Sequence, residues 1–462
     1  MNKPFTKIEP TGKNRKGGLY YRGFKKFIAL FFNHYLYKKV YYPDVENILP
    51  DGSPQIIISN HQNCLIDAIA VMLAFRGPGR KPYFWARADI FAVSKVLEKY
   101  IRFLGLMPAF RASHEGMDDI GKNDSSFHES RELLADGQSV MIFPEAGHQD
   151  KRYLGEFHGG FTTMAFQAAE DANFEKDIYI LPVINHYSDY FGMRREMLIK
   201  FGKPISLREY YDLYKEKPRT AMRQVSERFH NIISSMMLDI RDLDNYDSID
   251  FLRTNYGVKY AAIKNLPYKI LPEKLETEKK MVADLAALDD EKRTFFYNKA
   301  AELKKGLDET GLKFKDLKRK VSTGQVIFKA LACLVLLPLW IVSLWPHYLI
   351  YNIPKPLTNR MKDKMLSGSF FLGMSVVITI PLFYLISFFV VWGVLTIYMA
   401  LIYLALLPFL GLFCWEYTEL WDSFKQDLRL WKFQKRTKSA ILRGFKHTSE
   451  TIEDQLWSLF RI

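Results

Sequence analysis

The feature that most constrains this chain is an apolar run in its C-terminal third. From Phe370 to Trp415 there are 46 residues without one charged side chain. A helix that spans a bilayer needs about 20 apolar residues, so this run is long enough for two crossings joined by a tight turn near Gly393. A soluble core helix of that length would be very unusual. The sequence therefore predicts an integral membrane protein with a helical hairpin over 370–415.

A second apolar run precedes this hairpin. Residues 330–345 carry no charge, but they contain Pro338. Basic residues follow each run, in a linker at 355–364 and in a tail at 432–446, and the positive-inside tendency places both on the cytoplasmic side. An even number of crossings between linker and tail satisfies this tendency. We therefore expect segment 326–350 to be re-entrant or interfacial, with a full span as the alternative.

The rest of the chain divides into segments of different character. Its first residues are polar and lack the apolar core of a signal peptide. Next, Phe24, Phe27 and Phe31 recur at helical spacing among basic residues, which predicts a helix in the membrane interface; a core-facing helix is the alternative. The expected segments are a flexible arm (1–18), this amphipathic helix (19–45), an α/β domain (46–260), a charged helical segment (261–322), the membrane region (323–418) and a basic helical tail (419–462).

Charge and cysteine content narrow the function classes. The net charge is +14, from 65 basic and 51 acidic residues, which suits an anionic membrane surface or a phosphorylated substrate. A nucleic-acid partner is not expected, because no recognisable binding motif accompanies the charge. Cys64, Cys333 and Cys414 are far apart and two of them lie in apolar runs, so we expect neither a disulfide framework nor a metal site.

Residues 50–235 alternate between strand-like apolar runs and helix-like runs. This alternation predicts an α/β fold, a mostly parallel sheet with covering helices, to which the C-terminal transmembrane helices are added. Sites in such sheets form in the loops beyond the strand ends. The expected strands are Gln55–Ser59, Tyr83–Ala86, Ser139–Phe143, Tyr179–Val183 and Met197–Phe201, and the expected helices lie around 67–75, 90–101, 125–136, 160–171 and 217–238.

The first candidate site follows the first expected strand. The stretch ISNHQNCLIDAIAV, residues 58–71, places His61 at the end of an apolar run and Asp67 in the helix-like run after it. A neutral imidazole accepts a proton from a hydroxyl, and a carboxylate fixes its tautomer and stabilises the imidazolium. A loop histidine alone is more often a hydrogen-bonded surface residue, so the pair needs support from elsewhere in the chain.

A second candidate site lies in VMIFPEAGHQDKR, residues 140–152. A buried strand delivers Glu145 and a small flexible pair to its end, and Lys151 and Arg152 follow. Arg111 comes after another strand-like run, GLMPAF. Cations beside a strand end suit a phosphate-bearing polar substrate, because they supply charge-assisted hydrogen bonds.

These elements, in this order, resemble the motifs of the glycerolipid acyltransferases, the membrane enzymes that acylate glycerol 3-phosphate or lysophosphatidate. The resemblance covers roughly residues 50–205, and its first and third motifs are the specific ones. The matches are Asn60, His61 and Asp67 to the first motif, Arg111 to the second, Phe143, Pro144 and Glu145 to the third (with Ala146 in place of its glycine and Gly147 next), and Leu181, Pro182 and Val183 to the fourth.

The spacing of the first motif departs from most of the family. Five residues separate His61 from Asp67, where four are usual. The longer spacing is similar to that of a branch whose members use glycerol 3-phosphate or dihydroxyacetone phosphate. We expect the extra residue to bulge in the loop before the helix, so that the two side chains still meet.

The resemblance implies a mechanism without a cofactor or a covalent acyl-enzyme. The donor would be an acyl thioester of coenzyme A or acyl carrier protein, and the acceptor a hydroxyl of glycerol 3-phosphate or lysophosphatidate, in phospholipid biosynthesis at the cytoplasmic face of a membrane. Another lysolipid acceptor, or a non-catalytic membrane scaffold, are the alternatives. The roles implied are general base for His61, its orientation for Asp67, and substrate binding for Arg111, Glu145, Gly147, Lys151 and Arg152.

Overall fold

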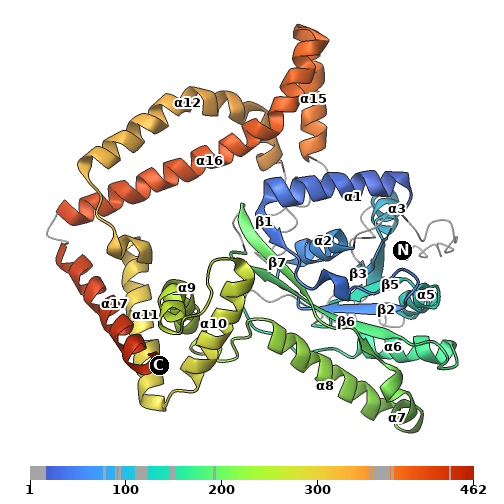
Figure 1. Cartoon of the computed structure of the whole chain (residues 1–462). Helices are drawn as coiled ribbons and strands as arrows, with labels where there is room; N and C mark the ends of the chain where they lie inside the picture. Colours follow the sequence, from blue (N-terminus) through green and yellow to red (C-terminus); the bar gives the residue numbers. More distant parts are fainter. Residues whose placement is uncertain are drawn as a thin grey trace. The chain divides into compact units, whose positions relative to one another are not determined.

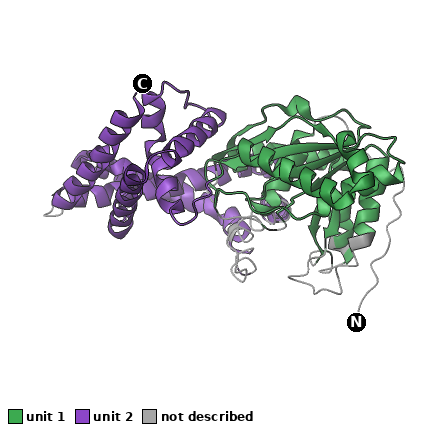
Figure 2. Ribbon diagram, turned by 90° about the horizontal axis from the view of Figure 1, so that it is seen from below, with its two compact units in different colours: residues 1–239 green, residues 240–462 purple. Residues whose placement is uncertain are grey.

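The computed structural model divides the chain into two compact units, Met1–Asp239 and Ile240–Ile462 (Figure 2). It describes residues 17–75, 80–88, 91, 95–109, 123–145, 147, 151–190, 194–353, 356, 375, 379–435 and 439–461. The α/β domain was expected to end at 260, whereas the first unit ends at Asp239 and helix α9 (Tyr246–Ile263) belongs to the second. Apart from the segment at 19–45, the other expected segment boundaries stay predictions.

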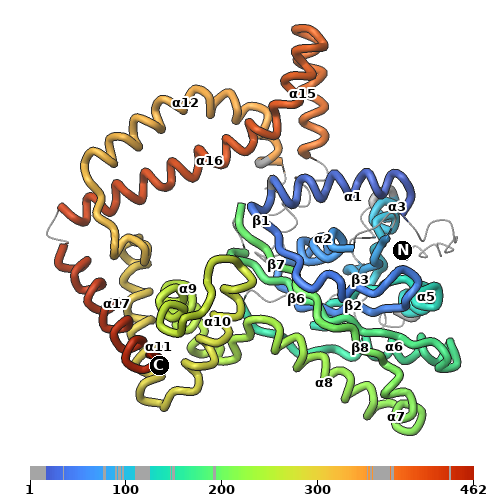
Figure 3. The backbone as a smooth tube through the Cα atoms, in the orientation of Figure 1, coloured from blue at the N-terminus to red at the C-terminus, as the bar shows by residue number. Residues whose placement is uncertain are grey.

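The first unit is built on an eight-stranded sheet (Figure 3). Its order is β1-β7-β6-β2-β5-β3-β4, and β8 pairs with β6. The pairs that β6 forms with β7 and β8 are antiparallel and the others are parallel, which confirms the expected mostly parallel sheet. The strands are β1 Tyr37–Tyr41, β2 Gln55–Ser59, β3 Tyr83–Arg87, β4 Leu106–Ala109, β5 Ser139–Ile142, β6 Tyr179–Tyr187, β7 Arg195–Phe201 and β8 Ile205–Ser206.

Strand β2 lies at the centre of this sheet and is buried on both faces. Its apolar residues run without alternation because helices cover both sides of the sheet. In the register, Ile58 lies opposite Ile142 of β5 and Pro182 of β6. The carboxyl ends of β2 and β5 therefore meet at one edge of the sheet, beside β6, where sites of α/β folds form.

Helices α1 and α2 lie on one side of the sheet, and α6 and α8 on the other (Figure 1). Helix α8 begins with Pro218, whose missing N–H costs nothing at that position. The helices of this unit are α1 Leu19–Phe31, α2 Cys64–Ala74, α3 Lys95–Phe103, α5 Asn123–Ala135, α6 Gly160–Asp171, α7 Tyr211–Glu216 and α8 Pro218–Met236.

The amphipathic segment expected as a helix over 19–45 is helical only in its first part. After α1 a short π-helix ends at Leu36, and β1 then pairs in parallel with β7. Tyr21 and Ile28 of α1 are buried against the domain, whereas Leu19 and Leu30 are exposed. The helix thus has a core face and an exposed apolar face, and its place in a membrane interface stays a prediction.

The second unit is helical. Its helix α11 is capped at both ends: the Asp289 carboxylate accepts from the backbone N–H of Lys292 at 2.9 Å, and Gly311 takes the left-handed conformation after the last turn. The helices are α9, α10 Leu271–Ala286, α11 Asp290–Thr310, α12 Thr323–Asn352, α15 Ile380–Val394, α16 Ile397–Lys435 and α17 Ser439–Phe460, with a 3-10 turn η6 at Phe314–Lys318.

Among the described residues, two helical stretches are long and apolar enough to cross a membrane, Thr323–Ile350 and Ile397–Lys435. Helix α15 is apolar but shorter. Part of the hairpin expected over 370–415 lies outside the described residues. Within the described part, α15 and the start of α16 are joined through Leu395 and Thr396.

Candidate active site

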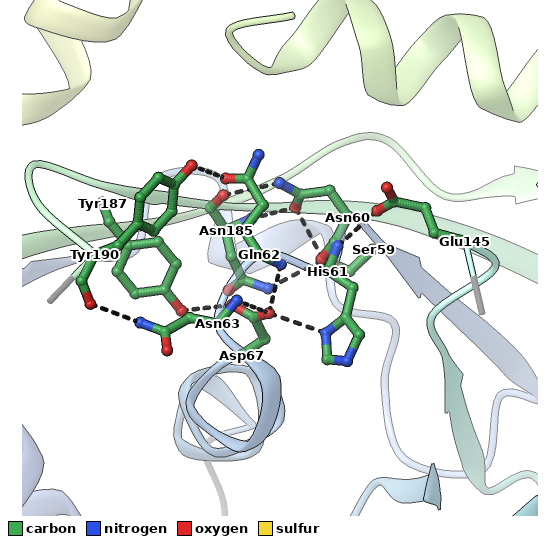
Figure 4. Close-up of polar contacts among 10 residues, drawn as sticks. All are labelled: Ser59, Asn60, His61, Gln62, Asn63, Asp67, Glu145, Asn185, Tyr187 and Tyr190. Atoms are coloured by element: carbon green, nitrogen blue, oxygen red, sulfur yellow. Dashed lines mark hydrogen bonds and ion pairs between the residues drawn. The ribbon is translucent and has the colours of Figure 1, made fainter. Parts of the chain in front are cut away.

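The centre of the candidate site is the loop between β2 and α2. Cys64, the first residue of α2, has a φ of 44°, so the chain turns sharply at the position where the longer spacing requires a bulge. One helical turn later, Asp67 Oδ2 lies 3.0 Å from Nδ1 of His61 (Figure 4). The Asp67 side chain is fully buried, and the His61 ring is 14% exposed. The expected His–Asp contact is therefore present, with one edge of the imidazole near the surface.

Asp67 is solvated by three further donors that replace water. The backbone N–H groups of Gln62 and Asn63 donate to Oδ2 at 2.9 and 2.8 Å, and the Tyr187 hydroxyl donates to Oδ1 at 2.5 Å. Because a carboxylate only accepts, Nδ1 of His61 carries the proton in this contact and Nε2 keeps its lone pair. In this tautomer, Nε2 is the ring nitrogen that can accept a proton.

Glu145 braces the same loop from the end of β5. Its Oε1 accepts from the backbone N–H of His61 at 2.7 Å, and its Oε2 accepts from the backbone N–H of Gly155 at 2.8 Å. Burial raises the pKa of this carboxyl from 4.5 to about 7, and the two N–H groups oppose that rise. The His61 ring also stacks on Phe143, with centroids 3.9 Å apart. Both carboxylate oxygens of Glu145 therefore accept from backbone N–H groups, and one of these groups belongs to His61.

A pair of asparagines ties the loop to β6. Asn60 Nδ2 donates to the carbonyl of Asn185 at 3.0 Å, and the Asn185 N–H donates to Asn60 Oδ1 at 2.7 Å. The Asn185 side chain in turn donates to Ser59 Oγ at 3.1 Å. Both asparagines are buried, so each bond compensates a polar group that water does not reach.

The predicted substrate-binding residues have different surroundings. Arg152 is 6% exposed; its guanidinium donates to the carbonyl of Tyr187 at 3.1 Å and lies 4.8 Å from the ring centre of Tyr190. Lys151 and Gly147 are partly exposed on the loop after Glu145. Arg111 lies outside the described residues. The structure thus brings His61, Asp67 and Glu145 together, and Arg152 contacts the neighbouring Tyr187 and Tyr190. The binding roles stay predictions.

The sequence reasoning missed two tyrosines. Strand β6 was expected to end at Val183 but continues to Tyr187, whose hydroxyl reaches Asp67. The hydroxyl of Tyr190 donates to Gln62 Oε1 at 2.8 Å, and its carbonyl accepts from Asn63 Nδ2 at 3.2 Å (Figure 4). Polar aromatic residues just beyond a buried apolar strand were the only available signal.

The model of the acyltransferase family matches residues 40–185. These residues form an acyltransferase domain. The match includes the motifs built around His61 and Glu145, and it ends at Asn185, two residues before Tyr187. The resemblance expected from those motifs is confirmed.

Two curated relatives of the acyltransferase domain are glycerolipid enzymes. The chain is 24% identical over 220 residues to glycerol-3-phosphate O-acyltransferase 2 of Saccharomyces cerevisiae, which covers 46% of this chain and 28% of that protein. It is 28% identical over 149 residues to the chloroplastic 1-acyl-sn-glycerol-3-phosphate acyltransferase LPAT1 of Arabidopsis thaliana, 32% of this chain and 38% of that one. The chain thus spans well under half the length of either relative.

One solved structure is also similar to part of the chain. It is the 1-acyl-sn-glycerophosphate acyltransferase PlsC of Thermotoga maritima, with 19% identity and a TM-score of 0.32. The similar region covers 46% of this chain and 80% of the Thermotoga protein.

Proposed function

We propose that this protein is a membrane-bound glycerolipid O-acyltransferase. It transfers a fatty acyl group from an acyl thioester to a hydroxyl of glycerol 3-phosphate or lysophosphatidate. The observation that supports this most is the contact between His61 Nδ1 and the buried Asp67, within a domain of the acyltransferase family. The relatives that act on glycerol 3-phosphate and its monoacyl product support the class of acceptor.

In the proposed reaction His61 is the general base. Its Nε2 takes the proton of the acceptor hydroxyl while the oxygen attacks the thioester carbonyl. The C–S bond then breaks, and the leaving thiolate takes the proton back from the imidazolium. Asp67 holds Nδ1–H throughout and stabilises the positive charge that develops on the ring. No covalent acyl-enzyme and no cofactor is needed for these steps.

Glu145 and Arg152, besides the substrate-binding roles expected for them, support the base. Glu145 holds the backbone of His61, and Arg152 holds the carbonyl of Tyr187, the residue that donates to Asp67. Rigid support of this kind is valuable because a general base works only within hydrogen-bond reach of its proton. We assign the phosphate of the acceptor to Arg111, Gly147 and Lys151. Replacing Arg111 by alanine should mainly raise the KM for that acceptor.

The test uses purified protein in detergent with labelled acyl thioesters of coenzyme A and of acyl carrier protein. Glycerol 3-phosphate, lysophosphatidate and several lysophospholipids are offered in parallel. The variant His61→Ala removes the base, and His128→Ala is the matched control, because His128 is 58% exposed on α5 and pairs with Glu132.

We expect transfer by the wild type and by His128→Ala, and almost none by His61→Ala. Transfer only to a different lysolipid would keep the chemistry and change the acceptor. Equal transfer by His61→Ala would refute the mechanism. No transfer to any acceptor would favour a scaffold on this fold.

A further inference from the structure

Helices α12 and α16 pack against each other in an antiparallel arrangement with a defined register (Figure 1). At one end, Lys329 of α12 donates to Ser423 at 2.7 Å and to Asp427. Further along, the Tyr417 hydroxyl donates to the carbonyl of Cys333 at 3.0 Å, and its ring stacks on Trp340 at 5.2 Å. The part of α12 from 329 to 340 therefore lies alongside the part of α16 from 417 to 427.

This register places charges beside the apolar half of α12. The uncharged run of α16 ends at Trp415, and Glu416, Glu419 and Asp422 follow, all with exposed side chains. Since Tyr417 lies against Cys333 and Trp340, these three carboxylates lie level with the stretch of α12 that begins the apolar run.

These neighbouring carboxylates make it energetically unfavourable for α12 to span a membrane. If 330–352 crossed a hydrocarbon layer of about 30 Å, residues 331–340 would occupy one half of it, at about 1.5 Å per residue. Glu416 would then lie near the midplane, with Glu419 and Asp422 between it and the surface. A carboxylate near the bilayer centre costs about 2.5–3.5 kcal/mol on insertion scales, and three of them would meet lipid without burial in protein.

The exposed surface of α12 is nevertheless strongly apolar. Its exposed side chains recur every three or four residues, so they form one stripe along the helix. The members of this apolar stripe include Phe328, Leu331, Leu334, Val335, Leu339, Val342 and Trp345, with exposed fractions from 47% to 79%. The stripe needs an apolar environment, while the neighbouring part of α16 needs water.

We propose that α12 and the 416–427 part of α16 lie along the surface of a lipid bilayer instead of crossing it. The stripe of α12 is sunk into the boundary of headgroups and acyl chains, and the carboxylates of α16 remain in water. The contacts of the buried Asp427 with Lys329 and Arg319 fix the register, so the carboxylates of α16 stay beside the apolar stripe of α12. The uncharged residues of α15 are left as the part that enters the hydrocarbon. This inference does not depend on the proposed reaction.

The test measures depth along the stripe. Single cysteines replace Leu331, Val335 and Val342 one at a time, each is labelled with a nitroxide, and the full chain is reconstituted into vesicles of phosphatidylcholine and phosphatidylglycerol. Depth follows from the ratio of accessibility to oxygen and to a water-soluble nickel complex, calibrated with spin-labelled lipids. The native cysteines are buried, so unmutated protein serves as the labelling blank, and a thermal midpoint confirms that each variant is folded.

We expect all three labels at the same shallow depth, about 5–10 Å below the headgroups, because the helix lies in the plane. A depth that changes by about 16 Å between 331 and 342 would show a crossing helix and overturn the proposal. Labels open to nickel would place the stripe in water, and labels closed to both reagents would show that protein covers it; either result would also overturn the proposal. Leu339 replaces any position whose variant does not fold.

Discussion

The two units bury carboxylates in different ways. In the first unit, Asp67 and Glu145 accept from backbone N–H groups, a tyrosine hydroxyl and an imidazole. In the second unit, Glu278 pairs with Arg253, and Asp427 with Arg319 and Lys329. Neutral dipoles solvate the first pair of acids, whereas fixed cations neutralise the second pair.

This difference separates carboxylates that support catalysis from carboxylates that support the stability of the fold. A carboxylate held by several neutral donors keeps most of them when one is removed. It therefore stays compensated while its imidazole partner takes part in proton transfer. A buried carboxylate that depends on a cation becomes an uncompensated charge when the cation is removed. We therefore expect substitutions at the first kind of cluster to change rates, and substitutions at the second kind to change stability.

The largest effect is expected at His61. His61→Ala should lower turnover by about 10²- to 10⁴-fold, the usual contribution of a positioned general base. The thermal midpoint should stay close to that of the wild type, because Asp67 retains the N–H groups of Gln62 and Asn63 and the hydroxyl of Tyr187. Acyl transfer and thermal unfolding are measured on the same preparation. A midpoint that falls as steeply as the rate would break the comparison.

The opposite result is expected at Arg253, which is 8% exposed and bonds Asp250 and Glu278. Arg253→Met should destabilise the second unit by about 3–5 kcal/mol, because it leaves a buried acid without its cation. This corresponds to a midpoint lower by roughly 10 °C. Lys299→Met is the matched control, since its partner Glu302 is exposed, and it should leave the midpoint unchanged. Equal midpoints for the two variants would contradict the assignment of Arg253.

The next prediction concerns the pH dependence of stability that the Glu145 carboxyl causes. Its folded pKa is raised, so the stability that it contributes is fully present below the unfolded value of 4.5 and is lost as the pH rises through about 7. The rise corresponds to about 3 kcal/mol. Glutamine does not titrate, so the stability of the wild type relative to Glu145→Gln should fall over this pH range. Thermal midpoints of both proteins between these pH values measure it, and parallel curves would rule the effect out.

The smallest effect is expected at Tyr187. Tyr187→Phe removes one donor to Asp67 and should lower kcat about 10-fold, the equivalent of one hydrogen bond to a charged group, with KM unchanged. Tyr211→Phe is the matched control, because it removes a hydroxyl that contacts the backbone of Lys176 and Ile178 away from the site. Steady-state kinetics on both variants separate the roles. A KM effect at Tyr187 would indicate contact with substrate.

The parts of the site whose residues lie close together in the sequence could be predicted. His61 and Asp67 are six positions apart at a strand end, and their contact follows from that spacing and one sharp turn. Tyr187 is 120 positions from Asp67, and the apolar pattern of β6 carries no sign of which carboxylate its last residue meets. Glu145 was found by its motif, but its residue type suggested substrate, and only its partners show that it holds the backbone of His61.

The α/β alternation, the apolar helices and the His–Asp spacing could be predicted from the sequence alone, because each depends on the order of residues within one short segment. Only the folded chain shows which donors surround the buried acids and which part of α16 lies beside α12. Those contacts join positions far apart in the chain, and the register of two strands or two helices is set by packing, which no local pattern encodes. The carboxylates of α16 bear on the membrane position of α12 only because the two helices lie side by side.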